Sequence, residues 1–255
     1  IGTRACVVLF RFLPIPTPEN DMSMFFEHAD PAARIVGGVQ AAAGSHPHMV
    51  AMSSGLIVRS FLCGGSLITT RTVLTAAHCI DALSIDIFFC YLCSSLRVTV
   101  GTNRWNSGGT SYSLARNVTH ANYVSATIKN DIGILITSSD VALNALVNLQ
   151  NGALSATLLE LTLSTLDGQD CVNRVAQASV DFNMRAPPVE PHIEVCTFHA
   201  PNFGTCNGDS GSALVRVDRN QQIGIVSWGF PCARGAPDMF ARVSAYQSWL
   251  QQHVV

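Results

Sequence analysis

Lysine is almost absent from this chain, which has one, Lys129, against fourteen arginines among 255 residues. Charge of either sign is also sparse, because only 13% of the residues are Asp, Glu, Lys or Arg and the formal net charge is -2. Such a chain offers no basic surface, so neither nucleic acid nor an anionic membrane is expected as a partner. Arginine stays protonated past pH ~12 but lysine only to ~10.4, so an arginine-rich surface would keep its ion pairs in an alkaline fluid. Compositional bias of the genome is the alternative explanation.

Long apolar runs and helical periodicity are missing as well. No apolar run approaches the roughly 18 residues that a membrane-spanning helix needs. From Ile35 onward, short β-type runs alternate with Gly, Ser and Asn, which predicts an all-β barrel fold. Examples of these runs are 48–52, 65–68, 73–75, 96–100, 132–137, 213–217 and 223–228. One helix is expected, at the end of the chain, where Ser244 can cap it and Tyr246, Trp249, Leu250 and His253 share a face.

Two segments are expected along the chain. Residues 1–34 contain a short apolar stretch, three closely spaced prolines and several acidic residues, which is typical of a leader followed by a propeptide. Residues 35–255 would form the folded part, which is long enough for one large domain or two small barrels. Nine cysteines indicate an oxidising, secreted setting.

Four short motifs carry the chemistry. Thr75-Ala76-Ala77-His78-Cys79 places a histidine beside a cysteine, and Asn130-Asp131-Ile132 places an aspartate at the start of an apolar run. Asn207-Gly208-Asp209-Ser210-Gly211-Ser212 contains a serine between glycines, and Arg34-Ile35-Val36-Gly37-Gly38 precedes them all. A histidine can act as general base for a serine nucleophile, and the order His, Asp, Ser differs from that of subtilisins and α/β-hydrolases. Together the motifs resemble the chymotrypsin-like serine proteases from Ile35 to Val255.

This resemblance implies two six-stranded antiparallel β-barrels, a C-terminal α-helix and an active site in the cleft between the barrels. Ser210 would be the nucleophile, His78 the general base and Asp131 the residue that orients the imidazole. The backbone N–H groups of Gly208 and Ser210 would form the oxyanion hole. The other histidines show no metal-ligand spacing, so no metal and no organic cofactor are expected.

The resemblance also implies activation and three disulfides. Cleavage after Arg34 by a trypsin-like protease would free the amine of Ile35 to pair with Asp209. The expected disulfides are Cys63–Cys79, Cys171–Cys196 and Cys206–Cys232, which leaves Cys6, Cys90 and Cys93 without a match. The product would be a secreted monomer that acts on proteins or peptides, is a target for protein protease inhibitors, and works in digestion in an alkaline gut lumen.

The specificity pocket is expected from the same motifs. Gly204, six residues before Ser210, would form its floor, and Ser227-Trp228-Gly229 its wall. Asp238 stands where many relatives have glycine. The combination of a glycine at the pocket floor and an aspartate at its wall resembles the brachyurins, the collagenolytic proteases of crabs and insects. We therefore expect cleavage after Phe, Tyr and Leu with some tolerance of Arg; an elastase- or collagenase-type preference, or an Asp238 that points away into solvent, are the alternatives.

Two spacings depart from the family. The segment 84–94 is an apolar excess with two of the unmatched cysteines, and roughly a dozen residues are missing after Leu149. The missing part would belong to the second barrel, so its loss would open a sheet edge and weaken the Ile35–Asp209 pairing. One explanation is that the gene was translated with wrong exon boundaries, so that intron was read into the insertion and an exon was lost. A real but impaired homologue that acts as a binding protein is the other. Asn117-Val118-Thr119 is a glycosylation pattern.

Overall fold

A computed structural model describes residues 35–255, except 43, 56–57, 82–94, 145–146, 148–157, 207 and 231. The expected leader and propeptide, with Cys6 and Arg34, lie outside the described residues. So do the apolar segment 84–94, with Cys90 and Cys93, and most of the shortened stretch after Leu149. The predictions made for these segments therefore stay predictions.

The first half of the chain is a closed six-stranded barrel in the strand order β2-β3-β4-β7-β6-β5. Its strands are β2 (Met49–Ser54), β3 (Ser60–Leu67), β4 (Thr72–Thr75), β5 (Arg97–Val100), β6 (Thr110–Thr119) and β7 (Gly133–Thr137). Every residue of β4 and β7 is buried, whereas β6 is largely exposed. β4 and β7 pair with Thr75 opposite Gly133, so the end of one strand lies beside the start of the other. This pairing brings together the segments that follow β4 and precede β7.

The second half is an open antiparallel sheet of five strands in the order β11-β12-β13-β10-β9. Its strands are β9 (Ser164–Thr165), β10 (Glu194–Phe198), β11 (Ala213–Arg216), β12 (Gln221–Gly229) and β13 (Asp238–Arg242). A separate pair joins β1 (Val39–Gln40) to β8 (Leu159–Glu160). The expected all-β fold is thus confirmed, with a full first barrel and, within the described ranges, a half-barrel in place of a second closed one.

The helices are α1 (Ala77–Asp81), α3 (Gly168–Asp181) and α4 (Gln247–His253), with 3-10 turns η2 (Ser125–Thr127) and η3 (Val243–Tyr246). The terminal helix was expected, but the role of Ser244 as its cap was wrong. Ser244 lies within η3, and Tyr246 precedes α4 without any side-chain cap. The shared face is as expected for three residues, since Tyr246, Trp249 and Leu250 pack on the core of the first barrel. No described helix has the length and apolar character needed to cross a membrane.

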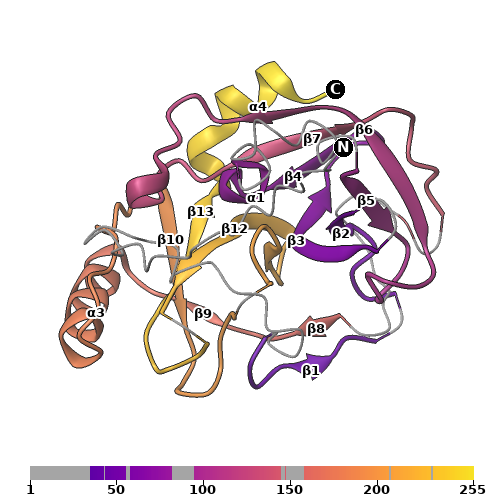
Figure 1. The fold of residues 1–255 in the computed structure, drawn as a ribbon. Helices are drawn as coiled ribbons and strands as arrows, with labels where there is room; N and C mark the ends of the chain where they lie inside the picture. The colour runs from indigo at the N-terminus through magenta and orange to yellow at the C-terminus, as the bar shows by residue number, and fades with distance from the viewer. Residues whose placement is uncertain are drawn as a thin grey trace, which may run out of the picture.

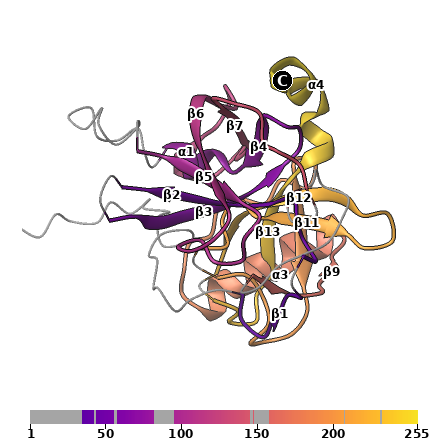
Figure 2. The ribbon, with the colours of Figure 1, turned by 90° about the vertical axis from the view of Figure 1, so that its right-hand side faces the viewer.

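The two halves meet along a polar seam. Figures 1 and 2 show the first barrel and α4 in the upper part of the molecule, with α3 beside the second sheet. Ser66 Oγ of β3 donates a hydrogen bond of 2.7 Å to Gln222 Oε1 of β12, and both side chains are buried. The backbone N–H of Gly64, also on β3, donates to the carbonyl of Ser210 at 2.8 Å. The candidate catalytic residues lie along this seam.

Candidate active site

His78 and Asp131 lie in contact at the β4–β7 edge of the first barrel. His78 is in α1, which follows β4 almost directly, and Asp131 lies just before β7. The backbone N–H of His78 donates to Asp131 Oδ1, and His78 Nδ1 lies 2.8 Å from Oδ2. Both side chains are buried, with exposed fractions of 7% and 2%. Because an ionised carboxylate only accepts hydrogen bonds, Nδ1 carries the proton and Nε2 keeps its lone pair.

Asp131 also receives a donor from the second half of the molecule. Ser227 Oγ on β12 donates to Asp131 Oδ2 at 2.6 Å. Burial by itself would raise the pKa of Asp131, but attraction to His78 and the hydrogen bonds from His78 and Ser227 outweigh it and lower the pKa. Asp131 is therefore held as a carboxylate. Ser227 was predicted only as part of the pocket wall, so this role of its hydroxyl was missed.

Ser210 is anchored to both halves by its backbone neighbours. Its carbonyl accepts the Gly64 N–H, and the next residue, Gly211, donates its N–H to Val226 at 2.9 Å. Gly64 follows Cys63, whose disulfide partner Cys79 is the residue after His78. Val226 precedes Ser227, which donates to Asp131. Two separate connections thus bring Ser210 into the neighbourhood of His78 and Asp131.

The loop before Ser210 presents backbone donors. Gly208 has a φ of +92°, in the region that favours glycine, and Asp209 N–H donates back to Cys206 at 3.1 Å. Within the part of the chain that the structure describes, the N–H groups of Gly208 and Ser210 have no hydrogen-bond acceptor. They stay the predicted donors of the oxyanion hole.

The segment after the predicted cleavage site lies against the predicted pocket floor. Val36 and Gly204 form a two-way backbone bridge, with N–O distances of 3.0 and 3.2 Å. The carboxylate of Asp209 accepts the Cys206 N–H at 2.9 Å. The pairing of the Ile35 amine with Asp209 stays a prediction, because Arg34 is outside the described residues.

The side chain of Asp238 points into the predicted pocket. β12 and β13 pair Gly229 with Asp238, and a Cβ built on Gly204 would lie 2.6 Å from Asp238 Oδ2. Thr205 donates its N–H to Oδ2 and its hydroxyl to Oδ1, at 2.9 and 2.8 Å. Asp238 is only 4% exposed, so the alternative of a solvated carboxylate that points away is wrong. Burial raises the pKa of Asp238 to about 6, although the two bonds from Thr205 oppose this shift.

Thr205 is the pocket residue that the sequence analysis missed. It is adjacent to Gly204, so its position could have been included, but nothing in the motif indicates that its hydroxyl faces Asp238. Trp228, on the predicted wall, is 2% exposed and packs with Ile128 and Met239.

The three expected disulfides are present: Cys63–Cys79, Cys171–Cys196 and Cys206–Cys232. The first joins β3 to α1, and the second joins α3 to β10. Cys63, Cys79 and His78 bring three potential metal-ligand atoms within 4.8 Å. The two sulfurs are bonded to each other and carry no thiolate, so this group is not suited to bind a metal ion.

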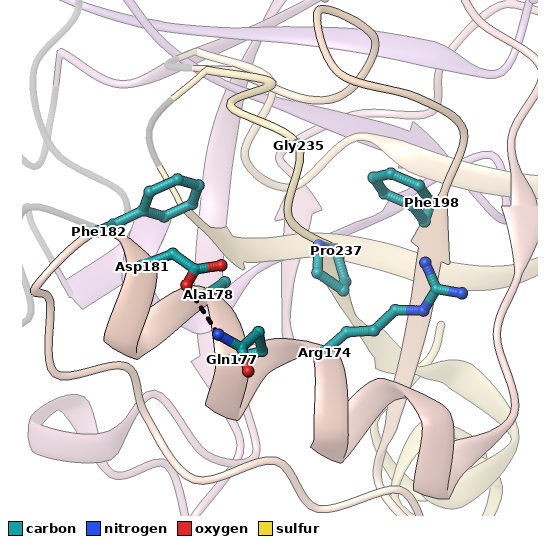
Figure 3. A pocket seen from close by; sticks show the side chains of 8 residues that line it. All are labelled: Arg174, Gln177, Ala178, Asp181, Phe182, Phe198, Gly235 and Pro237. Atoms are coloured by element: carbon teal, nitrogen blue, oxygen red, sulfur yellow. Dashed lines mark hydrogen bonds between the residues drawn. The ribbon is translucent and has the colours of Figure 1, made fainter.

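A separate depression lies on the α3 side of the second sheet. Figure 3 shows Phe182 and Phe198 around it, with Arg174 and Gln177 on α3 and Pro237 between the two rings. Gln177 donates to Asp181 at 2.7 Å, and Arg174 pairs with Asp170. The polar groups of this depression thus have partners within α3, and none of the predicted catalytic residues lines it.

Comparison with known proteins agrees with this arrangement. A sequence model of the Trypsin family matches residues 35–250. "Chymotrypsin" of Phaedon cochleariae is 34% identical over 247 residues, which cover 88% of this chain and 83% of that protein. "Chymotrypsin-2" of Vespa crabro is 30% identical, and the alignment covers 86% of this chain and 99% of that protein. "Trypsin" of Xenopus laevis is 32% identical, and the alignment covers 87% of this chain and 91% of that protein. The chain therefore belongs to the trypsin family and is a chymotrypsin-like serine endopeptidase.

Proposed function

We propose that this protease hydrolyses peptide bonds through an acyl-enzyme formed on Ser210. His78 Nε2 accepts the Ser210 proton as Oγ attacks the peptide carbonyl, and Asp131 stabilises the resulting imidazolium. The N–H groups of Gly208 and Ser210 donate to the oxyanion. The imidazolium then protonates the leaving amine, and water hydrolyses the ester by the same steps in reverse. The observation that carries this proposal is the buried His78–Asp131–Ser227 network beside Ser210.

The protein is proposed to be synthesised as a secreted zymogen, which is activated by cleavage after Arg34. The Val36–Gly204 bridge supports this, because it places the segment after Arg34 against the floor of the pocket. An Ile35 ammonium formed nearby would pair with Asp209 and order the oxyanion loop. Three disulfides fit an extracellular setting. The arginine-rich composition and the insect chymotrypsins among the relatives support a digestive role in an alkaline gut lumen.

The proposed specificity is chymotrypsin-like to broad. Gly204 and Gly229 carry no side chain, which favours Phe, Tyr or Leu as the substrate residue, while the Asp238 carboxylate, which lies against both glycines, would meet Arg at the same pocket. A competing role as a non-catalytic binding protein finds no support among the site residues, since the sequence keeps His78, Asp131 and Ser210.

The test is hydrolysis of a peptide panel with Phe, Leu, Ala or Arg before the scissile bond, measured before and after limited trypsin treatment. We expect activity only after cleavage, with preference for Phe or Leu, and covalent labelling of Ser210 by a serine-directed organophosphate. Replacement of Ser210 by Ala should lower kcat by about 10⁵ to 10⁶, as removal of a nucleophile does in similar enzymes.

The control variant is Arg34→Gln, which keeps the site and removes the cleavage point. Full activity of this variant would contradict the zymogen proposal. Failure of the correctly cleaved wild-type chain to react with the organophosphate would contradict the catalytic proposal.

A further inference from the structure

The only lysine of the chain is buried between the two halves of the molecule. Lys129 is 5% exposed and lies two residues before Asp131. Its Nζ donates to Glu194 Oε1 at 2.6 Å, and Glu194 is on β10 of the second sheet, also 5% exposed. A buried ion pair is costly to desolvate, so close geometry and further hydrogen bonds are needed to offset that cost.

Glu194 meets this need through Trp228. Trp228 Nε1 donates to Glu194 Oε1 at 2.9 Å, and the backbone N–H of Glu190 donates to Oε2 at 2.6 Å. Lys129 Nζ also lies 5.2 Å from the centroid of the Trp228 ring, a favourable cation–π distance. These contacts therefore join three segments of the chain through the side chains of Lys129, Glu194 and Trp228, here called the Lys129 cluster.

The backbone around Lys129 is in an unusual conformation. Ile128 and Asn130 have φ values of 51° and 54°, in the left-handed region that β-branched residues such as Ile rarely adopt. Strain of this kind persists only where surrounding contacts hold the segment. Ile128 packs in the same apolar cluster as Trp228, and Asn130 Nδ2 donates to the Asn122 carbonyl at 2.9 Å. The ion pair thus fixes a strained segment that leads directly into Asp131.

We propose that the Lys129–Glu194 pair is a positioning element that fixes the buried Trp228 indole and, through it, the backbone of Ser227-Trp228-Gly229, the predicted wall of the substrate channel. Glu194 acts through Trp228, and Lys129 acts through Glu194 and through the segment before Asp131. The inference rests on the proposed roles of Trp228 and Asp131. It gives a role to the lone lysine, whose compact ammonium with three donors meets a buried carboxylate.

The experiment compares two substrates with the same residue before the scissile bond. One is a single-residue ester, and the other is a peptide extended by three residues along the channel wall. The variants are Glu194→Gln, which keeps an acceptor for Trp228 without the charge, and Glu194→Met, which removes both. Asp170→Asn is the control, because it removes a carboxylate from an exposed ion pair with Arg174. All rates are normalised to active sites titrated with the organophosphate, so a smaller folded fraction does not enter them.

For the extended peptide we expect KM to rise about threefold in Glu194→Gln and about tenfold or more in Glu194→Met, while the ester changes by less than about twofold. Lys129→Met should behave like Glu194→Gln. Equal losses for both substrates, or no rise in KM, would show that the pair is merely structural. That result differs from failure of the proposed function, in which the wild-type enzyme itself would neither react with the organophosphate nor hydrolyse either substrate.

Discussion

The buried carboxyl group of Asp238 is expected to make the choice between apolar and basic substrates depend on pH. Burial raises the pKa of its carboxyl to about 6, and its oxygens face Gly204 and Gly229. Below that pKa the group is neutral and suits an apolar side chain. Above it the group is a carboxylate, which a bound arginine would stabilise.

The ratio of kcat/KM for Arg substrates to that for Phe substrates is therefore expected to rise with pH. Because the ionised fraction of a group with a pKa of about 6 grows from about 0.1 at pH 5 to nearly 1 at pH 8, the rise should be about tenfold. The catalytic residues are common to both substrates, so their own pH dependence does not enter the ratio. Asp238→Asn should make the ratio low and independent of pH, whereas Asp218→Asn, an exposed control, should leave it unchanged. A flat ratio in the wild-type enzyme would refute this role of Asp238.

Residue types in the site were predictable, but their orientations were only partly so. A motif such as Ala77-His78-Cys79 identifies a site residue from the residues next to it in the sequence, so no contact between distant segments has to be known. The direction of the Asp238 carboxylate depends instead on the register of β12 against β13, and the partner of Lys129 lies 65 residues away on β10. No local pattern encodes such pairs.

At the scale of elements, the loop that carries Ser210 packs without spare room on the first barrel. Gly211 has a φ of +80°, and a Cβ there would lie 2.3 Å from Thr75 Oγ1 and 2.4 Å from the Gly64 carbonyl oxygen. Thr75 Oγ1 itself donates to that carbonyl at 2.9 Å. The same Gly64 residue donates its N–H to Ser210, so any shift of β3 would move the nucleophile.

Gly211→Ala is expected to lower the free energy of unfolding by about 2–4 kcal/mol, because backbone strain and overpacking add. It should also lower kcat by at least a hundredfold, since Ser210 is displaced. Gly108→Ala is the matched control, because Gly108 has a similar φ of +73° but its nearest side-chain atom would be 3.3 Å from the new Cβ. Chemical denaturation and active-site titration give both quantities. Similar effects at the two positions would show that strain alone, and not the packing on β3 and β4, is responsible.

Strands were easier to predict from the sequence than helices. Each of the seven β-runs overlaps a strand of the structure, although the run 65–68 covers only the end of β3, and no run was given for β6, β10 or β13. The fourteen-residue helix α3 was missed, although Asp167 caps it and Cys171, Val175 and Ala178 form a buried face. These three residues recur at helical spacing among polar residues, so the amphipathic pattern of the helix was present in the sequence and could have been used to predict it. Its Cys171–Cys196 disulfide to β10 contributes to holding it there.

At the scale of the whole molecule, the two halves differ in how far the sequence predicts them. The first barrel closes because each of its six strands has two neighbours, and the predicted runs overlap five of these strands but not β6. The second half depends on pairings such as β9 with β10 and β1 with β8, each of two residues. A strand of two residues is too short to show an alternation of apolar and polar residues in the sequence. The stretch after Leu149 that was predicted to be shortened also precedes β8 and β9 in the chain.

Acid stability of the whole fold is expected to depend on His48. This residue precedes β2, is 3% exposed, and its Nδ1 has no hydrogen-bond partner among the described residues. The neighbouring ring of His46, itself 2.6 Å from a Glu160 oxygen, stands at 6.0 Å. Burial, and then repulsion from His46, lower the pKa of His48 to about 4. Between that value and the unfolded pKa of ~6.5, the unfolded chain binds more protons than the folded one, so stability falls as the pH falls.

When the pH falls from 7.5 to 4.5, the lowered pKa of His48 should reduce the free energy of unfolding by about 2–3 kcal/mol. The measurement is urea denaturation at both values in a Ser210→Ala background, which prevents self-digestion. Adding His48→Phe, which keeps an aromatic ring of similar size, should reduce the pH-dependent loss by that amount. Asp238 acts in the opposite direction, because its raised pKa stabilises the folded state as the pH falls through about 6, but it is common to both chains and cancels in the difference. His192→Phe, at an exposed position, should leave the loss unchanged. Equal losses with and without His48 would mean that acid acts elsewhere in the fold.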